Sequence, residues 1–268
     1  MLTFPNAKIN IGLNILRKRP DGYHDLASCF YPIGLSDALE AIPAQKAAFK
    51  TVGQGIRESE VNLVSKAINL LAKDHRVPPL SVFLLKGIPI GAGLGGGSAD
   101  AAFMIGMLND MLNLRLSADQ QEDYARQLGS DCAFFVRNVP MYCYEKGDRF
   151  EEIGLSLKGL QLFLVNPGIH VSTPAAYAGV TPAIPPLDLR EALAGPISGW
   201  KDNVVNDFEK SVFQAHPELA IIKNRLYDAG ALYASMSGSG SSVYGIFQNL
   251  ETMRNKFKNC FVWQGELN

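Results

Sequence analysis

The sequence predicts an α+β protein with two domains, divided near residue 156. At 268 residues the chain suits one large or two modest domains with a substantial core. Hairpin-like and helical patterns are mixed, which favours two α+β layers over a regularly alternating βαβ sheet. Two glycine-rich loops, 89–99 and 237–242, fall on separate halves and predict a cleft between them. We therefore expect one domain over 1–156 and a second over 157–268.

The N-terminal half begins with strands. Residues 1–55 alternate apolar and polar side chains and are interrupted by a turn signal at Arg19-Pro20-Asp21-Gly22, which predicts a hairpin. Helical spacing over Val61–Ala72 stops at a pair of prolines, and an apolar strand over Leu80–Leu85 follows. The further elements expected here are a helix over 99–114, a helix from Ala118 to Leu128, and short strands near Phe134 and Met141.

The C-terminal half continues the mixture of strands and helices. A strand is expected over Leu160–Val165, before a proline-rich stretch. Helical patterns then cover Phe208–Ala215 and Leu219–Ala229. Strands over Leu232–Met236 and Val243–Phe247 flank the second glycine-rich loop.

The first glycine-rich loop reads Pro89-Ile90-Gly91-Ala92-Gly93-Leu94-Gly95-Gly96-Gly97-Ser98-Ala99. Glycines let backbone N–H groups turn toward an anion with no Cβ in the way, and the N-terminus of the following helix directs further N–H groups to the same place. A flexible linker would not be flanked by an apolar strand and an apolar helix. The loop is therefore predicted to bind phosphate.

Several nucleotide-binding folds share the G-x-G-x-x-G pattern that Gly91, Gly93 and Gly96 satisfy. A dinucleotide-binding fold would place an acidic residue roughly 20 positions later, after a second strand, whereas Asp110 comes earlier and inside a helical pattern. A Walker A loop would end in Gly-Lys-Ser/Thr, and the protein-kinase pattern would be followed by H-R-D and D-F-G; neither is found. The loop thus indicates a nucleotide without identifying the class of protein.

Composition excludes some partners. The 26 acidic and 25 basic residues nearly balance, so no basic field favours nucleic acid or an anionic membrane. The four cysteines are scattered, with no histidine at metal-ligand spacing, as expected for free thiols in a reducing cytosol. No signal-like start and no apolar run of about 18 residues is found. We expect a cytoplasmic protein that is a monomer or a weak homodimer.

Two charged residues in apolar surroundings are candidates for phosphoryl-transfer chemistry. Lys8 lies between Ala7 and Ile9, where a buried charge would need a partner; an edge lysine on a solvated face is the alternative. Asp131 follows a helix end, where an aspartate commonly bonds its local backbone as a turn residue. If the two side chains meet, the lysine keeps the carboxylate ionised and directs an alcohol's proton toward it, which is general-base chemistry.

Two aromatic segments are candidates for ligand recognition. In Asp21-Gly22-Tyr23-His24 a planar ring and an imidazole follow a turn and could stack on and hydrogen-bond a ring-bearing ligand; a plain hairpin turn is the alternative. Thr173 and Tyr177, at the start of a short predicted helix, are the second candidate segment. The alternative interpretation of Thr173 is an ordinary N-cap.

The order of six segments resembles the GHMP small-molecule kinases. The segments are Ala7-Lys8-Ile9-Asn10, Asp21-Gly22-Tyr23-His24, the loop Pro89–Ala99, Leu128-Gly129-Ser130-Asp131, Ser172-Thr173-Pro174 through Tyr177, and Ser237-Gly238-Ser239-Gly240-Ser241-Ser242. The resemblance covers nearly the whole chain, and its first two segments are typical of members that act on a cytidine-diphosphate derivative of methylerythritol. It implies an N-terminal ATP-binding domain like ribosomal protein S5 domain 2 and a C-terminal ferredoxin-like α+β domain, with both substrates between them.

The resemblance further implies ATP with Mg²⁺ as phosphoryl donor and CDP-methylerythritol as acceptor, phosphorylated on its 2-hydroxyl in the non-mevalonate route to isoprenoid precursors. By this likeness Lys8 and Asp131 match the catalytic pair, and the loop Pro89–Ala99 matches the ATP site together with Asn62 and Lys86. The substrate-contacting positions are matched by Asn10, Tyr23, His24, Thr173 and Tyr177, with the cytosine between the two tyrosines and its edge bonded to the histidine.

Some features depart from the family pattern or leave alternatives open. Cys132-Ala133 stand where the family usually has a β-branched residue and proline after the aspartate, and the metal ligands stay unknown, with Ser98 a candidate. The alternatives are a GHMP kinase for mevalonate, homoserine or a sugar, a dinucleotide-dependent oxidoreductase, and an inactive nucleotide-binding module.

Overall fold

The computed structural model describes residues 1–53, 62–250 and 253–268, which form two compact units that interleave along the chain. Unit 1 comprises Met1–Ala7, Leu35–Ile90 and Gly95–Val139. Unit 2 comprises Lys8–Gly34, Gly91–Leu94 and Pro140–Asn268. The division into domains 1–156 and 157–268 stays a prediction.

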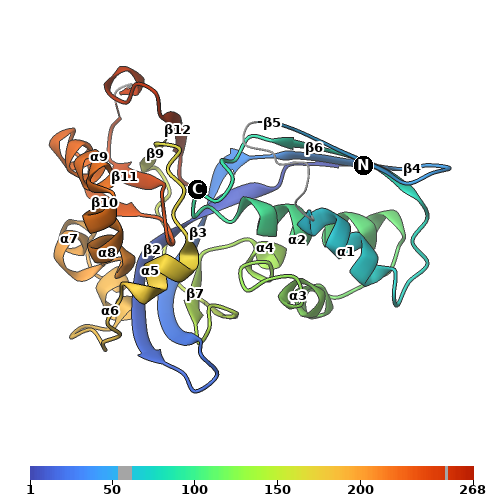
Figure 1. The fold of residues 1–268 in the computed structure, drawn as a ribbon, viewed down its shortest axis with the longest axis horizontal. Helices are drawn as coiled ribbons and strands as arrows, with labels where there is room; N and C mark the ends of the chain where they lie inside the picture. Colours follow the sequence, from blue (N-terminus) through green and yellow to red (C-terminus); the bar gives the residue numbers. More distant parts are fainter. Residues whose placement is uncertain (54–61, 251–252) are drawn as a thin grey trace. The chain divides into compact units, whose positions relative to one another are not determined.

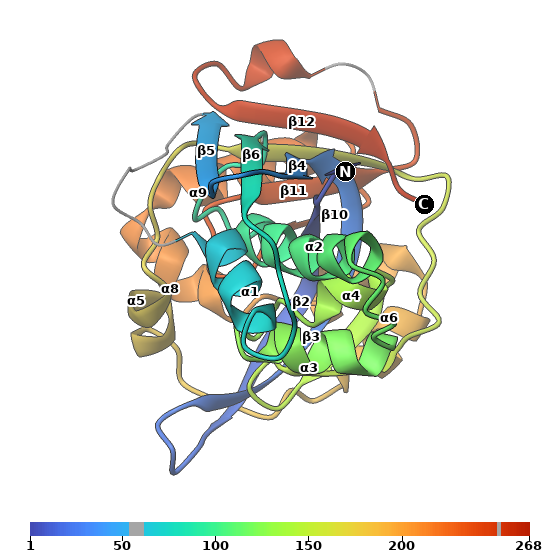
Figure 2. The ribbon, with the colours of Figure 1, turned by 90° about the vertical axis from the view of Figure 1, so that its right-hand side faces the viewer.

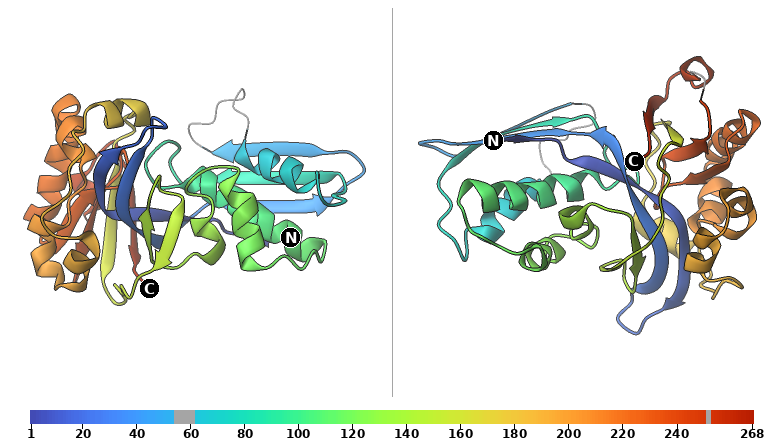
Figure 3. Two further views of the ribbon diagram at one scale, coloured as in Figure 1. Left: turned by 90° about the horizontal axis from the view of Figure 1, so that it is seen from below. Right: turned by 180° about the vertical axis from the view of Figure 1, so that it is seen from behind.

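Unit 1 contains a mixed sheet with helices on one face (Figures 1 and 3). Its strands lie in the order β1 (Leu2–Thr3), β4 (Ala38–Pro43), β6 (Leu80–Lys86) and β5 (Ala48–Gly53). β6 runs antiparallel to β4 and parallel to β5. Along β6, Val82 and Leu84 are buried whereas Phe83 and Leu85 are exposed, and this period of two explains a strand with one face toward the core.

The helices of unit 1 are α1 (Leu63–Leu71), α2 (Gly96–Met111), α3 (Ala118–Arg126) and α4 (Phe134–Arg137). α2 packs against each of the other three, and its apolar side chains Met104, Ile105 and Leu108 are fully buried. The start of α3 is fixed by a capping box, in which the Ser117 side chain bonds the Gln120 backbone and the Gln120 side chain bonds back.

The described residues of unit 2 contain two four-stranded sheets. One sheet has the order β2 (Asn6–Lys18), β3 (His24–Ser36), β7 (Met141–Tyr144) and β8 (Arg149–Glu152). The other has the order β10 (Tyr233–Met236), β11 (Val243–Phe247), β9 (Gln161–Asn166) and β12 (Phe261–Glu266), with β12 at the edge (Figure 2). All side chains of β11 are buried, as expected for a central strand.

The helices of unit 2 are α5 (Thr173–Ala178), α6 (Leu189–Ala194), α7 (Trp200–Asn203), α8 (Phe208–Ala215) and α9 (Pro217–Asp228). α9 packs against β10, β11 and α8. Its buried side chains are Leu219, Ile222 and Leu226, spaced so that they share one helix face. Within the described part of the chain, no helix is both long and apolar enough to cross a bilayer.

Most predicted elements are confirmed, but the start of α2 and the element near Phe134 differ. α2 begins at Gly96 rather than Ala99, because Gly95 adopts a left-handed conformation directly before it. The strand predicted near Phe134 is wrong: these residues form α4, and a short apolar run does not distinguish a strand from a helical turn. β12 was not predicted, since its mostly half-buried side chains give a weak pattern. Val61, the first residue of the predicted helix, lies outside the described residues.

Gly12 in β2 supplies a test of how tightly unit 2 is packed. Its φ is +70°, and an added Cβ would lie 2.6 Å from Leu189 Cδ1 and 3.0 Å from Val204 Cγ1. Gly12→Ala is expected to lower the free energy of unfolding by about 1–3 kcal/mol, through both backbone strain and overpacking. Gly159→Ala is the control, because Gly159 has a φ of +83° and nothing within 4 Å of an added Cβ. If urea denaturation shows that Gly12→Ala and Gly159→Ala lose the same free energy of unfolding, the packing contribution is contradicted.

Candidate active site

The glycine-rich loop leads into an uncapped helix N-terminus. Gly91, Gly93 and Gly95 have φ values of +66°, +79° and +71°, which other residues rarely adopt. Gly95 stands at the N-cap position of α2 and has no side chain to accept from the first N–H groups of the helix, which suits an anion as their partner. The loop therefore has the backbone geometry of a phosphate site, and phosphate binding itself stays a prediction.

The two glycine-rich loops touch at Gly93 and Ser237, both in unit 2. Ser237 Oγ donates to the Gly93 carbonyl at 2.9 Å, and an added Cβ on Gly93 would lie 2.1 Å from the Ser237 carbonyl oxygen. Ser242 N also donates to the Ala92 carbonyl at 3.2 Å. The backbones of the two loops are therefore packed together at this point, and the expected cleft stays a prediction.

Asn10 in β2 holds Lys8 in place. Both side chains are buried, with exposed fractions of 2% and 3%. The Lys8 ammonium donates to Asn10 Oδ1 at 2.5 Å and lies 4.2 Å from the centroid of the Phe30 ring, while Asn10 Nδ2 donates to Ser28 Oγ at 2.9 Å. The alternative of a solvated edge lysine is thus wrong. Because Asn10 uses its amide within the protein, substrate contact by Asn10 stays a prediction.

Asp131 lies in the turn before α4, beside the start of α2. It is half-buried, and Ser130 Oγ donates to its Oδ1 at 3.4 Å. The thiol of its neighbour Cys132 interacts with the Ser98 hydroxyl in the first turn of α2, and burial raises the pKa of this thiol to about 11. Unit 1 thus brings the predicted base to the end of the glycine-rich loop. Lys8 belongs to unit 2, so its pairing with Asp131 stays a prediction.

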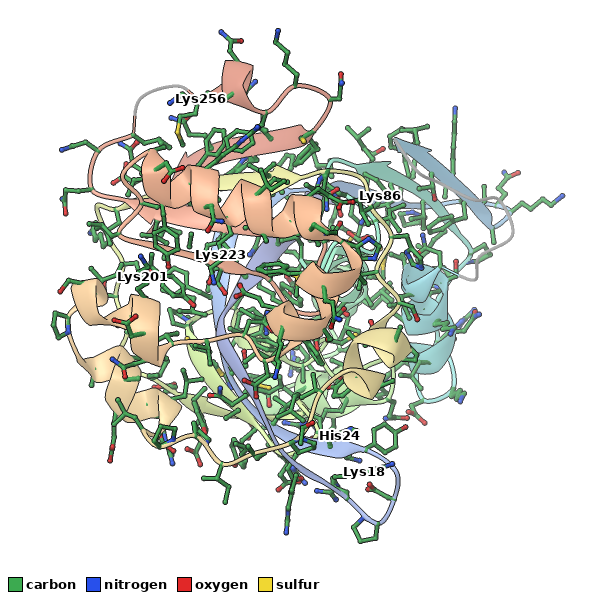
Figure 4. The ribbon with its side chains drawn as sticks, turned by 60° about the vertical axis from the view of Figure 1, so that its left-hand side comes forward. Lys18, His24, Lys86, Lys201, Lys223 and Lys256 are labelled. Atoms are coloured by element: carbon green, nitrogen blue, oxygen red, sulfur yellow. The ribbon has the colours of Figure 1, made fainter. Side chains whose placement is uncertain are left out.

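Lys86, at the end of β6 (labelled in Figure 4), lies in a buried charge cluster that the sequence did not reveal. Its ammonium donates to the carboxylates of Asp37 and Asp100, and the Lys86–Asp100 distance is 2.6 Å. Asn62 is also engaged locally, as the N-cap that accepts from Val64 N at 2.8 Å. Contact of Lys86 and Asn62 with ATP stays a prediction.

The aromatic residues predicted to hold the acceptor lie partly together in unit 2. His24, the first residue of β3 (Figure 4), stacks on Tyr177 with ring centroids 5.0 Å apart, and Phe208 meets Tyr177 edge-on at 4.8 Å. Tyr23 is 63% exposed, with the Lys146 ammonium 5.3 Å from its ring centroid. This arrangement offers planar faces to a ring-bearing ligand.

Thr173 begins α5, and the residue at the N-cap position is Ser172, so the alternative of Thr173 as N-cap is wrong. Its hydroxyl lies 3.1 Å from Ser239 Oγ in the second glycine-rich loop. This contact links α5, which carries Tyr177, to that loop. A role for Thr173 in binding substrate stays a prediction.

The described residues contain no group of three or more His, Cys, Asp or Glu side chains that could hold a metal ion. Mg²⁺ commonly keeps several waters and binds through substrate phosphates with one or two protein ligands. No protein ligand is therefore assigned to Mg²⁺.

Comparison with known proteins defines the class. The family description "GHMP kinases N terminal domain" matches residues 62–138, and "GHMP kinases C terminal" matches residues 189–262. The chain belongs to the GHMP kinase family, has its two-domain fold of mixed helices and sheets, and is a small-molecule kinase, which implies the use of ATP.

Its relatives narrow the comparison further. The chain is 50% identical over 270 residues to the 4-diphosphocytidyl-2-C-methyl-D-erythritol kinase of Parabacteroides distasonis, with 100% of both chains covered. It is 50% identical over 273 residues to the enzyme of the same name from Bacteroides fragilis, again with 100% of both covered. A crystal structure of 4-(cytidine 5'-diphospho)-2C-methyl-D-erythritol kinase matches with a TM-score of 0.81 and 30% identity, covering 100% of this chain and 99% of that chain.

The buried cluster predicts a pH-dependent contribution to stability. Burial, reinforced by the charge of Asp37 and opposed by Lys86, raises the pKa of Asp100 from 3.8 to about 7. A carboxyl with a raised pKa in the folded state stabilises the fold fully below pH of about 4 and loses that contribution as the pH rises through about 7.

Asp100→Asn removes this titration. The free energy of unfolding of the wild type, minus that of Asp100→Asn, is therefore expected to fall steadily as the pH rises from about 4 to about 8. Urea denaturation across this range measures the difference. A difference that stays constant with pH would contradict the raised pKa.

Proposed function

We propose that this chain transfers the γ-phosphoryl group of ATP to the 2-hydroxyl of 4-diphosphocytidyl-2-C-methyl-D-erythritol, giving ADP and the 2-phosphate. The observation that carries this proposal is the end-to-end likeness to kinases named for this substrate. The reaction would serve non-mevalonate isoprenoid biosynthesis in the cytoplasm. We expect the enzyme to act as a monomer or weak homodimer, without nucleic-acid or membrane partners.

In this proposal the glycine-rich loop binds the phosphates of ATP. The supporting feature is the run of left-handed glycines that ends at the uncapped N-terminus of α2. Phosphoryl transfer depends mainly on positioning and on stabilising charge over the transferring oxygens, so fixed backbone N–H donors are the largest protein contribution. Mg²⁺ would enter with ATP and neutralise phosphate charge when bound.

Asp131 is proposed to accept the proton of the 2-hydroxyl as that oxygen attacks the γ-phosphorus and the bond to ADP breaks. Its place next to Cys132, whose thiol meets Ser98 at the start of α2, supports this role. Lys8 is proposed to pair with this carboxylate, and its buried, Asn10-bound ammonium is suitably fixed. A carboxylate positioned in this way contributes roughly 10²–10⁴-fold to the rate.

Acceptor selection is proposed to rest on the aromatic residues of unit 2. Stacking on an aromatic side chain stabilises a nucleobase by about 1–3 kcal/mol and tolerates any base. Hydrogen bonds to the base edge are therefore needed for specificity, and His24 is the candidate because it lies against Tyr177. Tyr23 would cover the other face of the cytosine.

An ATP-consumption assay tests the activity. Purified protein is expected to form ADP with CDP-methylerythritol and to leave mevalonate, homoserine and sugars unphosphorylated. Of these compounds only CDP-methylerythritol carries a cytosine for the aromatic residues. Identifying the product as the 2-phosphate by NMR completes the test. Turnover of another alcohol alone would replace the proposal with a different GHMP kinase activity, and enhanced NADH fluorescence on mixing would support the oxidoreductase alternative.

Asp131→Asn tests the base. It is expected to lower kcat by roughly 10²–10⁴-fold while leaving the Kd for ATP nearly unchanged, because the amide keeps the shape of the side chain and cannot accept the proton. Single-turnover kinetics and calorimetric titration with ATP give the two quantities. Asp110→Asn, on the exposed end of α2, is the matched control and should retain wild-type kcat. Near-normal turnover by Asp131→Asn would remove this residue from the mechanism.

A further inference from the structure

Three charged side chains of unit 1 meet beneath the ends of the glycine-rich loop. Asp37 directly precedes β4, Lys86 ends β6, and Asp100 lies near the start of α2. Their side chains are almost entirely buried, with exposed fractions of 0%, 7% and 3%. We call these three residues the Asp37–Lys86–Asp100 cluster.

The cluster holds the chain at the point where it leaves β6. Asp37 Oδ1 accepts from Gly87 N at 2.6 Å and from Ile88 N at 2.8 Å, while its other oxygen accepts from the Lys86 ammonium. Asp37 is itself held by its backbone N–H, which donates to the Pro5 carbonyl at 2.8 Å. One carboxylate therefore fixes the two residues that open the connection from β6 to α2.

The cluster also holds the start of α2. Lys86 Nζ donates to Asp100 Oδ2 at 2.6 Å. An added Cβ on Gly96, the first residue of α2, would lie 3.0 Å from Ile88 Cγ2 and 3.4 Å from Lys86 Nζ. The first turn of the helix thus packs directly on Lys86 and on the residue that Asp37 binds.

Stability alone is a poor explanation for such a cluster. Burying charges costs desolvation free energy, and apolar replacements of buried ion pairs are often neutral or stabilising. In this cluster the desolvation cost is only partly offset, because two carboxylates share one ammonium. In addition, Asp100 Oδ1 is buried with no hydrogen-bond partner among the described residues. What the charges provide instead is directional bonding to both ends of one loop.

We propose that Asp37 and Asp100 are positioning residues, which act through Lys86 and the backbone to hold the two ends of the phosphate loop at the spacing that ATP requires. This inference rests on the proposed function, in that the loop binds ATP. Lys86 then serves as a bridge beneath the loop instead of a direct nucleotide contact. A misplacement of about 1 Å can lower a reaction rate about 100-fold, which shows how strongly function depends on position. A small displacement at either end of the loop is therefore expected to weaken ATP binding as well.

The carboxylate variants Asp37→Asn and Asp100→Asn separate this role from direct contact. Each replaces a carboxyl group with a neutral amide of the same shape and leaves the lysine in place. The proposal expects a Kd and a KM for ATP raised about tenfold or more, with the KM for CDP-methylerythritol within about twofold of wild type. If Lys86 instead binds ATP directly, releasing it from a carboxylate will leave ATP affinity unchanged or raise it, and that result overturns the proposal.

A matched control separates positioning from general loss of stability. Leu108→Ala removes a fully buried side chain of α2 outside the cluster and is expected to cost about 2–5 kcal/mol of stability. At temperatures where it is as destabilised as the carboxylate variants, its KM for ATP should stay within about twofold of wild type. If the KM for ATP rises equally in Leu108→Ala and in the carboxylate variants, the cluster has only a structural role and the proposal is overturned.

Calorimetric titration with ATP, thermal unfolding and steady-state kinetics on the full chain supply these readouts. If Asp37→Asn does not fold, Asp100→Asn decides, because it leaves the bonds to Gly87 and Ile88 intact. Wild-type protein that binds ATP but does not phosphorylate CDP-methylerythritol would overturn the proposed function alone, since the inference concerns ATP binding.

Discussion

The close approach of Gly93 to Ser237 is the constraint on which the candidate site depends. A Cβ on Gly93 would overlap the Ser237 carbonyl oxygen, so only glycine lets these two backbones meet. Ser237 Oγ accepts from Asn10 N and donates to the Gly93 carbonyl, which joins β2, the first loop and the second loop in one bonded group. The residue that holds Lys8 is thereby tied to the middle of the glycine-rich loop.

Two lysines, Lys8 and Lys86, are buried in different surroundings. Lys8 donates to the amide oxygen of Asn10 and lies over the Phe30 ring. Lys86 is surrounded by the carboxylates of Asp37 and Asp100, which outnumber its charge. Two carboxylates around one buried ammonium suit a lysine that joins structural elements.

Local patterns predicted the elements whose boundaries are set locally. α8 was predicted over its observed range, Phe208–Ala215, because its apolar spacing stops where its helix stops. The start of α2 was misplaced because Gly96 and Gly97 are poor helix formers, and the close approach of Gly96 to Ile88 explains why glycine begins the helix. The Asp37–Lys86–Asp100 cluster could not be read from sequence, since its members are brought together only by the pairing of β4 with β6 and the packing of α2. Motif order, by contrast, indicated the family directly.

Burial divides the candidate site into a rigid part and an adaptable part. Lys8, Asn10 and Ser237 are buried and bonded to one another, so their positions follow from the fold of unit 2. Tyr23 is largely exposed on the turn before β3, where fewer contacts restrain its ring. Transfer of a phosphoryl group requires fixed donors, whereas recognition of a base by stacking tolerates small movements of a planar ring. Changes in acceptor preference within this fold are therefore expected to begin at exposed positions such as Tyr23, on the turn before β3.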